Sequence, residues 1–128
     1  MNKYFRQLTI PTTRGKNIAA RLYQAESDAI IIMSHGFCGS KSAGGRFDQT
    51  AEGLVKENYN VINFDFVGCG ESDDEILDVD NMVEDLIAVI DYAGSIGFDK
   101  IALYGHSLGA YVSLKAYSDK ITTIALSG

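Results

Sequence analysis

Residues 101–117 read IALYGHSLGAYVSLKAY, and this stretch decides the fold. A short apolar run, Ile101 to Tyr104, leads directly into Gly105-His106-Ser107-Leu108-Gly109, and residues with helical spacing follow. The pentapeptide has the form G-x-S-x-G, and its setting between a buried strand and a helix is typical of a nucleophile elbow. We therefore predict that Ser107 is a nucleophile at the N-terminus of a helix, where developing negative charge is favoured.

Apolar runs and helical stripes alternate along the chain. The runs have the composition of strands buried on both faces of a parallel sheet, and they are Ala29 to Met33, Val61 to Phe64, Ile101 to Tyr104 and Ile121 to Leu126. The stripes between them are Phe47, Ala51, Leu54 and Val55; Met82, Leu86, Val89, Ile90 and Ala93; and Ala110, Leu114 and Tyr117. This alternation predicts an α/β fold with right-handed crossovers.

Two further segments have a simple structural interpretation. Tyr4 to Ile10 and Asn17 to Gln24 resemble an antiparallel hairpin that turns around Pro11 to Gly15. The stretch from Glu71 to Asp80 is rich in acidic residues. A metal site is conceivable there, but we favour a solvated loop whose last acids cap the following helix.

Composition narrows the class of protein. The chain has 128 residues, of which 46% are hydrophobic and 22% charged, which is the balance of one soluble globular domain. Its formal net charge of -6 disfavours nucleic acid or an anionic membrane as a partner. No apolar run reaches the length of a membrane span or a signal peptide, and Cys38 and Cys69 form neither a disulfide framework nor a C-x-x-C metal site. We expect a cytoplasmic protein without a bound metal.

A second motif, Ser34-His35-Gly36-Phe37, follows the run Ala29 to Met33. Acyl transfer needs backbone N–H donors for the oxyanion, and one donor comes from the loop at this place in the fold. We predict that the N–H groups of Phe37 and Leu108 form the oxyanion hole. His35 is expected to be structural, because the catalytic base follows the serine in the chain order of this fold.

The third motif, Asp65-Phe66-Val67-Gly68-Cys69-Gly70-Glu71-Ser72, follows the run that ends at Phe64. A dinucleotide fingerprint would need a third glycine where Asp73 stands, so that interpretation fails. The remaining pattern, D-x-x-G-x-G-x-S, fits a tight glycine turn after a central strand. Cys69 in this turn is expected to be a bystander, because no histidine is placed to activate it.

With these motifs together, the chain resembles an α/β-hydrolase of the serine aminopeptidase S33 group. It is similar to cinnamoyl- and feruloyl-type carboxylesterases and to monoacylglycerol-lipase-like enzymes. The resemblance implies a mostly parallel twisted sheet with helices on both faces, and hydrolysis of a small-molecule carboxylic ester through an acyl-enzyme without a cofactor. His35, Gly36 and His106 are candidate substrate-binding residues. Residues 1–128 would then be the N-terminal part of a single domain, truncated after the strand that follows the nucleophile helix.

One departure from the family is the end of the catalytic triad. No histidine follows Ser107, and the only later acid is Asp119. His106 is not expected to replace the missing base, because adjacent side chains on so tight a turn diverge. We predict that the isolated chain is nearly inactive. Its last strand, with Ile121, Ile124 and Leu126, would be an unprotected sheet edge that favours self-association or completion by a C-terminal half.

Two interpretations of function remain open at this stage. In the first, the chain is part of a working serine esterase. In the second, it is a non-catalytic remnant or an interaction module that keeps the elbow by inheritance. Thioester, amide and carbon–carbon bond cleavage share the same elbow, so the sequence does not define the substrate.

Overall fold

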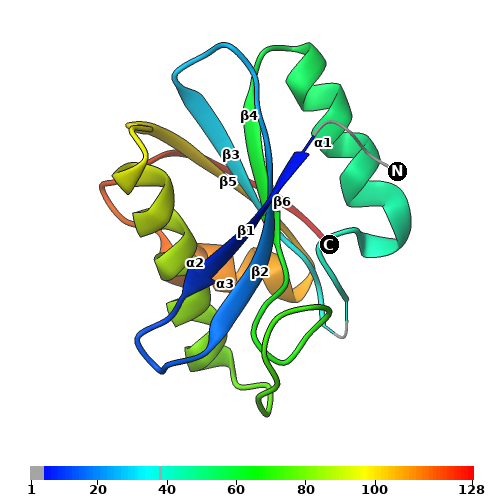
Figure 1. The fold of residues 1–128 in the computed structure, drawn as a ribbon, viewed down its shortest axis with the longest axis vertical. Helices are drawn as coiled ribbons and strands as arrows, with labels where there is room; N and C mark the ends of the chain where they lie inside the picture. The colour runs from blue at the N-terminus through cyan, green and yellow to red at the C-terminus, as the bar shows by residue number, and fades with distance from the viewer. Residues whose placement is uncertain (1–4, 38) are drawn as a thin grey trace.

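The computed structural model describes residues 5–37 and 39–128, which fold into a six-stranded sheet flanked by helices (Figure 1). The strands are β1 (Phe5–Pro11), β2 (Asn17–Tyr23), β3 (Ala29–Ser34), β4 (Asn60–Phe64), β5 (Lys100–His106) and β6 (Ile121–Ser127). The helices are the short 3-10 turn η1 (Ala43–Gly45), α1 (Arg46–Lys56), α2 (Val79–Ser95) and α3 (Leu108–Ala116). Every element expected from the apolar pattern is present in this part of the chain.

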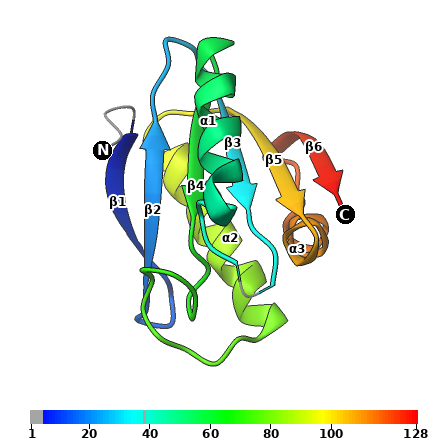
Figure 2. The same cartoon turned by 90° about the vertical axis from the view of Figure 1, so that its right-hand side faces the viewer.

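The sheet is mostly parallel and twisted, with the strand order β1-β2-β4-β3-β5-β6 (Figure 2). β3 pairs in parallel with β4 and β5, and β5 pairs in parallel with β6. β1 and β2 form the predicted antiparallel hairpin, although Tyr4 lies outside the described residues and Pro11 ends β1 instead of starting the turn. The parallel strands therefore all have their carboxyl ends at the same end of the sheet, where ligands bind in open α/β folds.

Helices cover both faces of the sheet, as Figure 2 shows with α1 in front of the strands and α2 behind them. The side chains of β4 alternate between two apolar clusters, because successive residues of a strand point to opposite faces. Val61 packs with Phe47 and Ala51 of α1, whereas Ile62 belongs to the larger cluster that includes Leu86 of α2. The core is thus divided by the sheet, and both layers hold the strand ends in place.

The apolar stripe expected on α3 does not face the core. Leu114 and Tyr117 are both 54% exposed, and the buried face consists instead of Gly109, Val112, Ser113 and Ala116. The expectation was wrong because α3 starts directly at the elbow, where Gly109 must face β3. That close approach fixes the rotation of the helix and turns Leu114 outward.

The acid-rich segment behaves mainly as a capping and anchoring loop. Asp78 is the N-cap of α2, and its side chain accepts a hydrogen bond from the N–H of Asn81 at 3.2 Å. Asp80 lies in the first turn, where its charge stabilises the positive end of the helix. Glu75 pairs with Arg14 of the β1–β2 turn at 2.6 Å. The expected helix-capping role is therefore confirmed for Asp78.

Candidate active site

The elbow places Ser107 on a strained backbone between β5 and α3. Its φ of 56° and ψ of -119° lie outside the regions that residues with side chains normally adopt. The flanking glycines allow this turn because there is no room for a side chain at either position. A Cβ on Gly105 would clash with the carbonyl oxygen of Gly109, and a Cβ on Gly109 would clash with that of Ser34. Ser107 is consequently exposed at the carboxyl end of the sheet.

The end of β6 supports the elbow from the side. The N–H of Ser107 donates to the carbonyl oxygen of Ser127 at 2.8 Å. The hydroxyl of Ser127 lies 2.9 Å from Nδ1 of His106 and 2.9 Å from the hydroxyl of Tyr104. Sequence reasoning missed Ser127 and Tyr104, because no motif marks them and the contacts depend on β6 pairing with β5.

The loop after β3 approaches the elbow closely. A Cβ on Gly36 would lie 3.3 Å from Cβ of Ser107, so the backbone of this loop faces the nucleophile directly. Phe37 follows, and its side chain is 67% exposed. Leu108 starts α3, and N–H groups in the first turn of a helix have no partner within the helix. Both predicted oxyanion donors therefore come from segments that border Ser107.

His35 is buried beneath this loop and is only 1% exposed. The N–H of Phe66 donates to its Nε2 at 3.2 Å, so Nδ1 carries the hydrogen and donates to the carbonyl oxygen of Gly36 at 2.7 Å. Burial is the main cause that lowers the pKa of His35 below its ordinary value of 6.5. Its hydrogen bonds fix the loop, as expected of a structural histidine.

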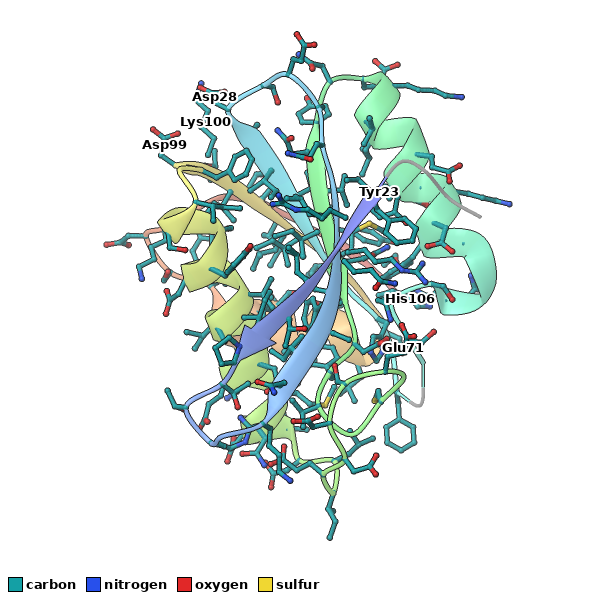
Figure 3. All side chains as sticks on the ribbon, in the orientation of Figure 1. Tyr23, Asp28, Glu71, Asp99, Lys100 and His106 are labelled. Atoms are coloured by element: carbon teal, nitrogen blue, oxygen red, sulfur yellow. The ribbon has the colours of Figure 1, made fainter. Side chains whose placement is uncertain are left out.

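A pocket of about 550 Å³ opens beside Ser107. Its lining includes Ser107, His106, Gly36, Phe37, Ser40 and Arg46. Figure 3 shows His106 and Glu71 near the same end of the sheet, whereas Asp28, Asp99 and Lys100 lie at the opposite end. The predicted nucleophile, the predicted oxyanion loop and both histidines thus share one pocket. Arg46 adds an exposed positive charge that the sequence motifs did not reveal.

The third motif lies beside the loop that carries Gly36 and Phe37, and its aspartate contacts that loop. Asp65 is fully buried and accepts hydrogen bonds from Lys41 of that loop. Cys69 is half-buried in the same turn, and Cys38 lies outside the described residues. No group of three or more histidine, cysteine, aspartate or glutamate side chains within residues 5–37 and 39–128 is arranged to hold a metal ion.

Comparison with known proteins identifies the family of the chain. The family model described as serine aminopeptidase, S33, matches residues 25–128. The chain belongs to this family. Among its curated relatives is the monoglyceride lipase homolog of monkeypox virus, which is 32% identical over 95 residues, covering 71% of this chain and 33% of the relative.

Solved structures show that this S33 chain has the α/β-hydrolase fold. The esterase Pf2001 of Pyrococcus furiosus matches with a TM-score of 0.83 and 28% identity, covering 90% of this chain and 47% of that one. The α/β-hydrolase GrgF of Penicillium matches with a TM-score of 0.88 and 22% identity, covering 95% and 45%. The chain therefore spans about half the length of these structures and about a third of its curated relatives.

The length and hydropathy of the helices in this S33 chain determine whether any of them could cross a membrane. None of those in residues 5–37 and 39–128 is both long and apolar enough to cross a bilayer. A location in the cytoplasm stays a prediction.

Proposed function

We propose that the protein hydrolyses carboxylic esters of small molecules through an acyl-serine intermediate on Ser107. The observation that carries this proposal is the strained elbow, which opens into the same pocket as the Gly36–Phe37 backbone. A strained serine costs on the order of 1–3 kcal/mol and persists only where the surrounding structure enforces it. The esterase Pf2001 among the solved relatives supports ester chemistry over the other reactions of this fold.

In this proposal the reaction proceeds in two steps without a cofactor. Oγ of Ser107 attacks the ester carbonyl carbon and gives its proton to a general base. The N–H groups of Phe37 and Leu108 stabilise the oxyanion, the C–O bond breaks, and the alcohol leaves with that proton. Water then hydrolyses the acyl-serine by the reverse proton path. Gly36 and His106 line the pocket where the substrate would lie.

The general base and its acid are proposed to come from outside residues 1–128. No histidine follows Ser107 in the sequence. His106 has its Nδ1 engaged with Ser127, as a residue that supports the elbow would. We therefore propose that these residues are the N-terminal part of one hydrolase domain and that the remaining triad members lie in the part that the longer relatives possess.

The test is ester hydrolysis by the polypeptide isolated from its native source, after its intact mass has been measured. We expect hydrolysis of p-nitrophenyl butyrate and loss of that activity in Ser107→Ala. Ser95→Ala is the matched control, because this exposed serine of α2 lies away from the pocket. Full activity in Ser107→Ala, or no hydrolysis of any ester by the native polypeptide, would contradict the proposal and favour a non-catalytic remnant.

A second measurement concerns residues 1–128 alone. Without a triad base, only acceleration by the oxyanion hole and binding remains, roughly 10³- to 10⁴-fold over water. We therefore expect the 128-residue chain to be nearly inactive and to react slowly with a fluorophosphonate, which requires an activated hydroxyl. Turnover typical of intact esterases, abolished by Ser107→Ala, would refute the external base while leaving Ser107 as the nucleophile.

A further inference from the structure

Lys41 is the only lysine among the described residues that is buried, with a side chain 6% exposed. It ends the loop that carries Gly36 and Phe37. Its backbone N–H donates to Oδ1 of Asp65 at 2.6 Å, and its Nζ donates to Oδ2 of the same carboxylate at 2.6 Å. Lysine is almost never buried without such a partner. The carboxylate therefore fixes both the backbone and the side chain of Lys41.

Asp65 connects this loop to the loop after β4. It is fully buried, and its carboxylate accepts a third hydrogen bond, from the N–H of Glu71 to Oδ2 at 2.9 Å. Gly70, with a φ of 51°, lies directly against the carboxylate, because a Cβ at this position would overlap it. The D-x-x-G-x-G-x-S motif thus packs around the buried carboxylate of its own aspartate and hydrogen-bonds to it. Glu71 also pairs with Nζ of Lys41 at 2.6 Å.

The other end of the same loop is fixed on the next residue of the motif. His35 accepts the hydrogen bond from the N–H of Phe66, and the two rings pack edge to face with centroids 5.0 Å apart. Between these two attachments, the side chain of Phe37 is 67% exposed. The side chain of Phe37 therefore adds little packing that could hold the loop, so the hydrogen bonds of the flanking residues carry more of that role.

We infer that the Lys41–Asp65 pair positions the oxyanion-hole backbone, with both residues acting through the loop and neither touching substrate. This inference rests on the proposed esterase function. The presence of a buried ion pair supports this inference. An apolar pair of similar volume often stabilises a fold as well as a buried ion pair does, so stability alone does not explain why Lys41 and Asp65 stand here. What the pair adds is a two-point attachment with defined geometry. A donor misplaced by about 1 Å can lower the rate roughly 100-fold.

The experiment compares three substitutions in the native polypeptide. Lys41→Met removes the cation, and the double variant Lys41→Met with Asp65→Asn also removes the charge that would otherwise be left buried and unpaired. Lys41→Arg tests rescue by another cation. Lys100→Met is the matched control, since this lysine forms an exposed ion pair with Asp28 at 3.3 Å at the opposite end of the sheet (Figure 3).

Two readouts separate positioning from stability. The first is the split between kcat and KM for p-nitrophenyl butyrate. The second is amide hydrogen exchange of Gly39, whose N–H donates to the carbonyl oxygen of Gly36 at 3.1 Å within the loop, compared with exchange of Leu103 in β5. We expect kcat to fall roughly 100-fold in the folded double variant while KM changes little. Protection of Gly39 should fall while that of Leu103 stays, and Lys41→Arg should recover part of kcat.

Three results would overturn the inference: unchanged kcat in the folded double variant, an equal loss of protection at Gly39 and Leu103, or the same loss of kcat in Lys100→Met. If the parent protein shows no hydrolysis that depends on Ser107, the proposed function has failed. The exchange of Gly39 then decides by itself whether Lys41 and Asp65 order the loop, because that readout needs no chemistry.

Discussion

Gly109→Ala should destabilise the protein strongly, although the same substitution in other helices stabilises them. The added Cβ would meet the carbonyl oxygen of Ser34 and would lie 2.6 Å from that of His35. Both are backbone atoms, held by β3 and by the start of the oxyanion loop, so neither can rotate away. Overpacking of this kind costs about 1–3 kcal/mol or more. Because both contacts are with fixed backbone oxygens, the upper end of that range applies. Replacing a helical glycine returns about 0.5–1 kcal/mol, which leaves a net loss of about 2 kcal/mol.

Gly94→Ala is the matched control for this prediction. Gly94 lies in α2, and apart from its chain neighbours and the adjacent backbone of its own helix, no described atom lies within 4 Å of a Cβ placed there. Only the gain in helix propensity applies, so we expect stabilisation by about 0.5–1 kcal/mol. Urea unfolding followed by the fluorescence of the seven tyrosines measures both variants in a chain without tryptophan. Equal effects at the two positions, or a stable Gly109→Ala protein, would refute the argument from close approach.

Three other predictions concern charge and assembly. Because the neutral form of His35 accepts a backbone hydrogen bond and burial lowers its pKa, its contribution to stability is complete above pH 6.5. That contribution is lost as the pH falls below 6.5 towards the folded-state pKa, since the unfolded chain takes up the proton first. In His35→Gln, the difference between the urea unfolding midpoints at pH 7.5 and pH 5.5 should therefore be smaller than in the parent protein. Arg14→Met leaves the fully buried Asp85 without its cation at 2.9 Å and should cost about 3 kcal/mol, whereas Lys120→Met breaks an exposed pair and should cost under about 1 kcal/mol; equal losses in urea unfolding would contradict this. The 128-residue chain should self-associate through the unpaired edge of β6, and a single monomer peak in analytical ultracentrifugation would argue against it.

The elbow could be predicted from sequence because its determinants are contiguous. Strand, glycine, serine, glycine and helix follow one another within residues 101–117, and backbone sterics alone require that order. The hairpin and the parallel strands were equally local, since their apolar patterns belong to single segments. The loop that is predicted to carry an oxyanion donor could be located in the sequence because its motif directly follows a strand. The geometry around Ser107 agrees with these expectations, while its catalytic role stays a prediction.

What the sequence did not show depends on contacts between distant residues. Lys41 and Asp65 are 24 positions apart, and a lysine in a glycine-rich loop has the pattern of a solvated residue until the fold buries it. Ser127 reaches His106 only through the pairing of β6 with β5. The wrong stripe on α3 has the same origin, because helical periodicity does not say which face a neighbouring strand will cover.

The hydrogen bond from Ser107 to Ser127 has a consequence for biosynthesis. Ser107 emerges from the ribosome about 20 residues before Ser127, whose carbonyl oxygen accepts the hydrogen bond from its backbone. At roughly 5–20 residues per second, the elbow waits about 1–4 s for its partner strand. During that interval the strained turn lacks one of the hydrogen bonds that support it. Ser107 is thus among the last positions of residues 1–128 whose backbone contacts are completed during translation.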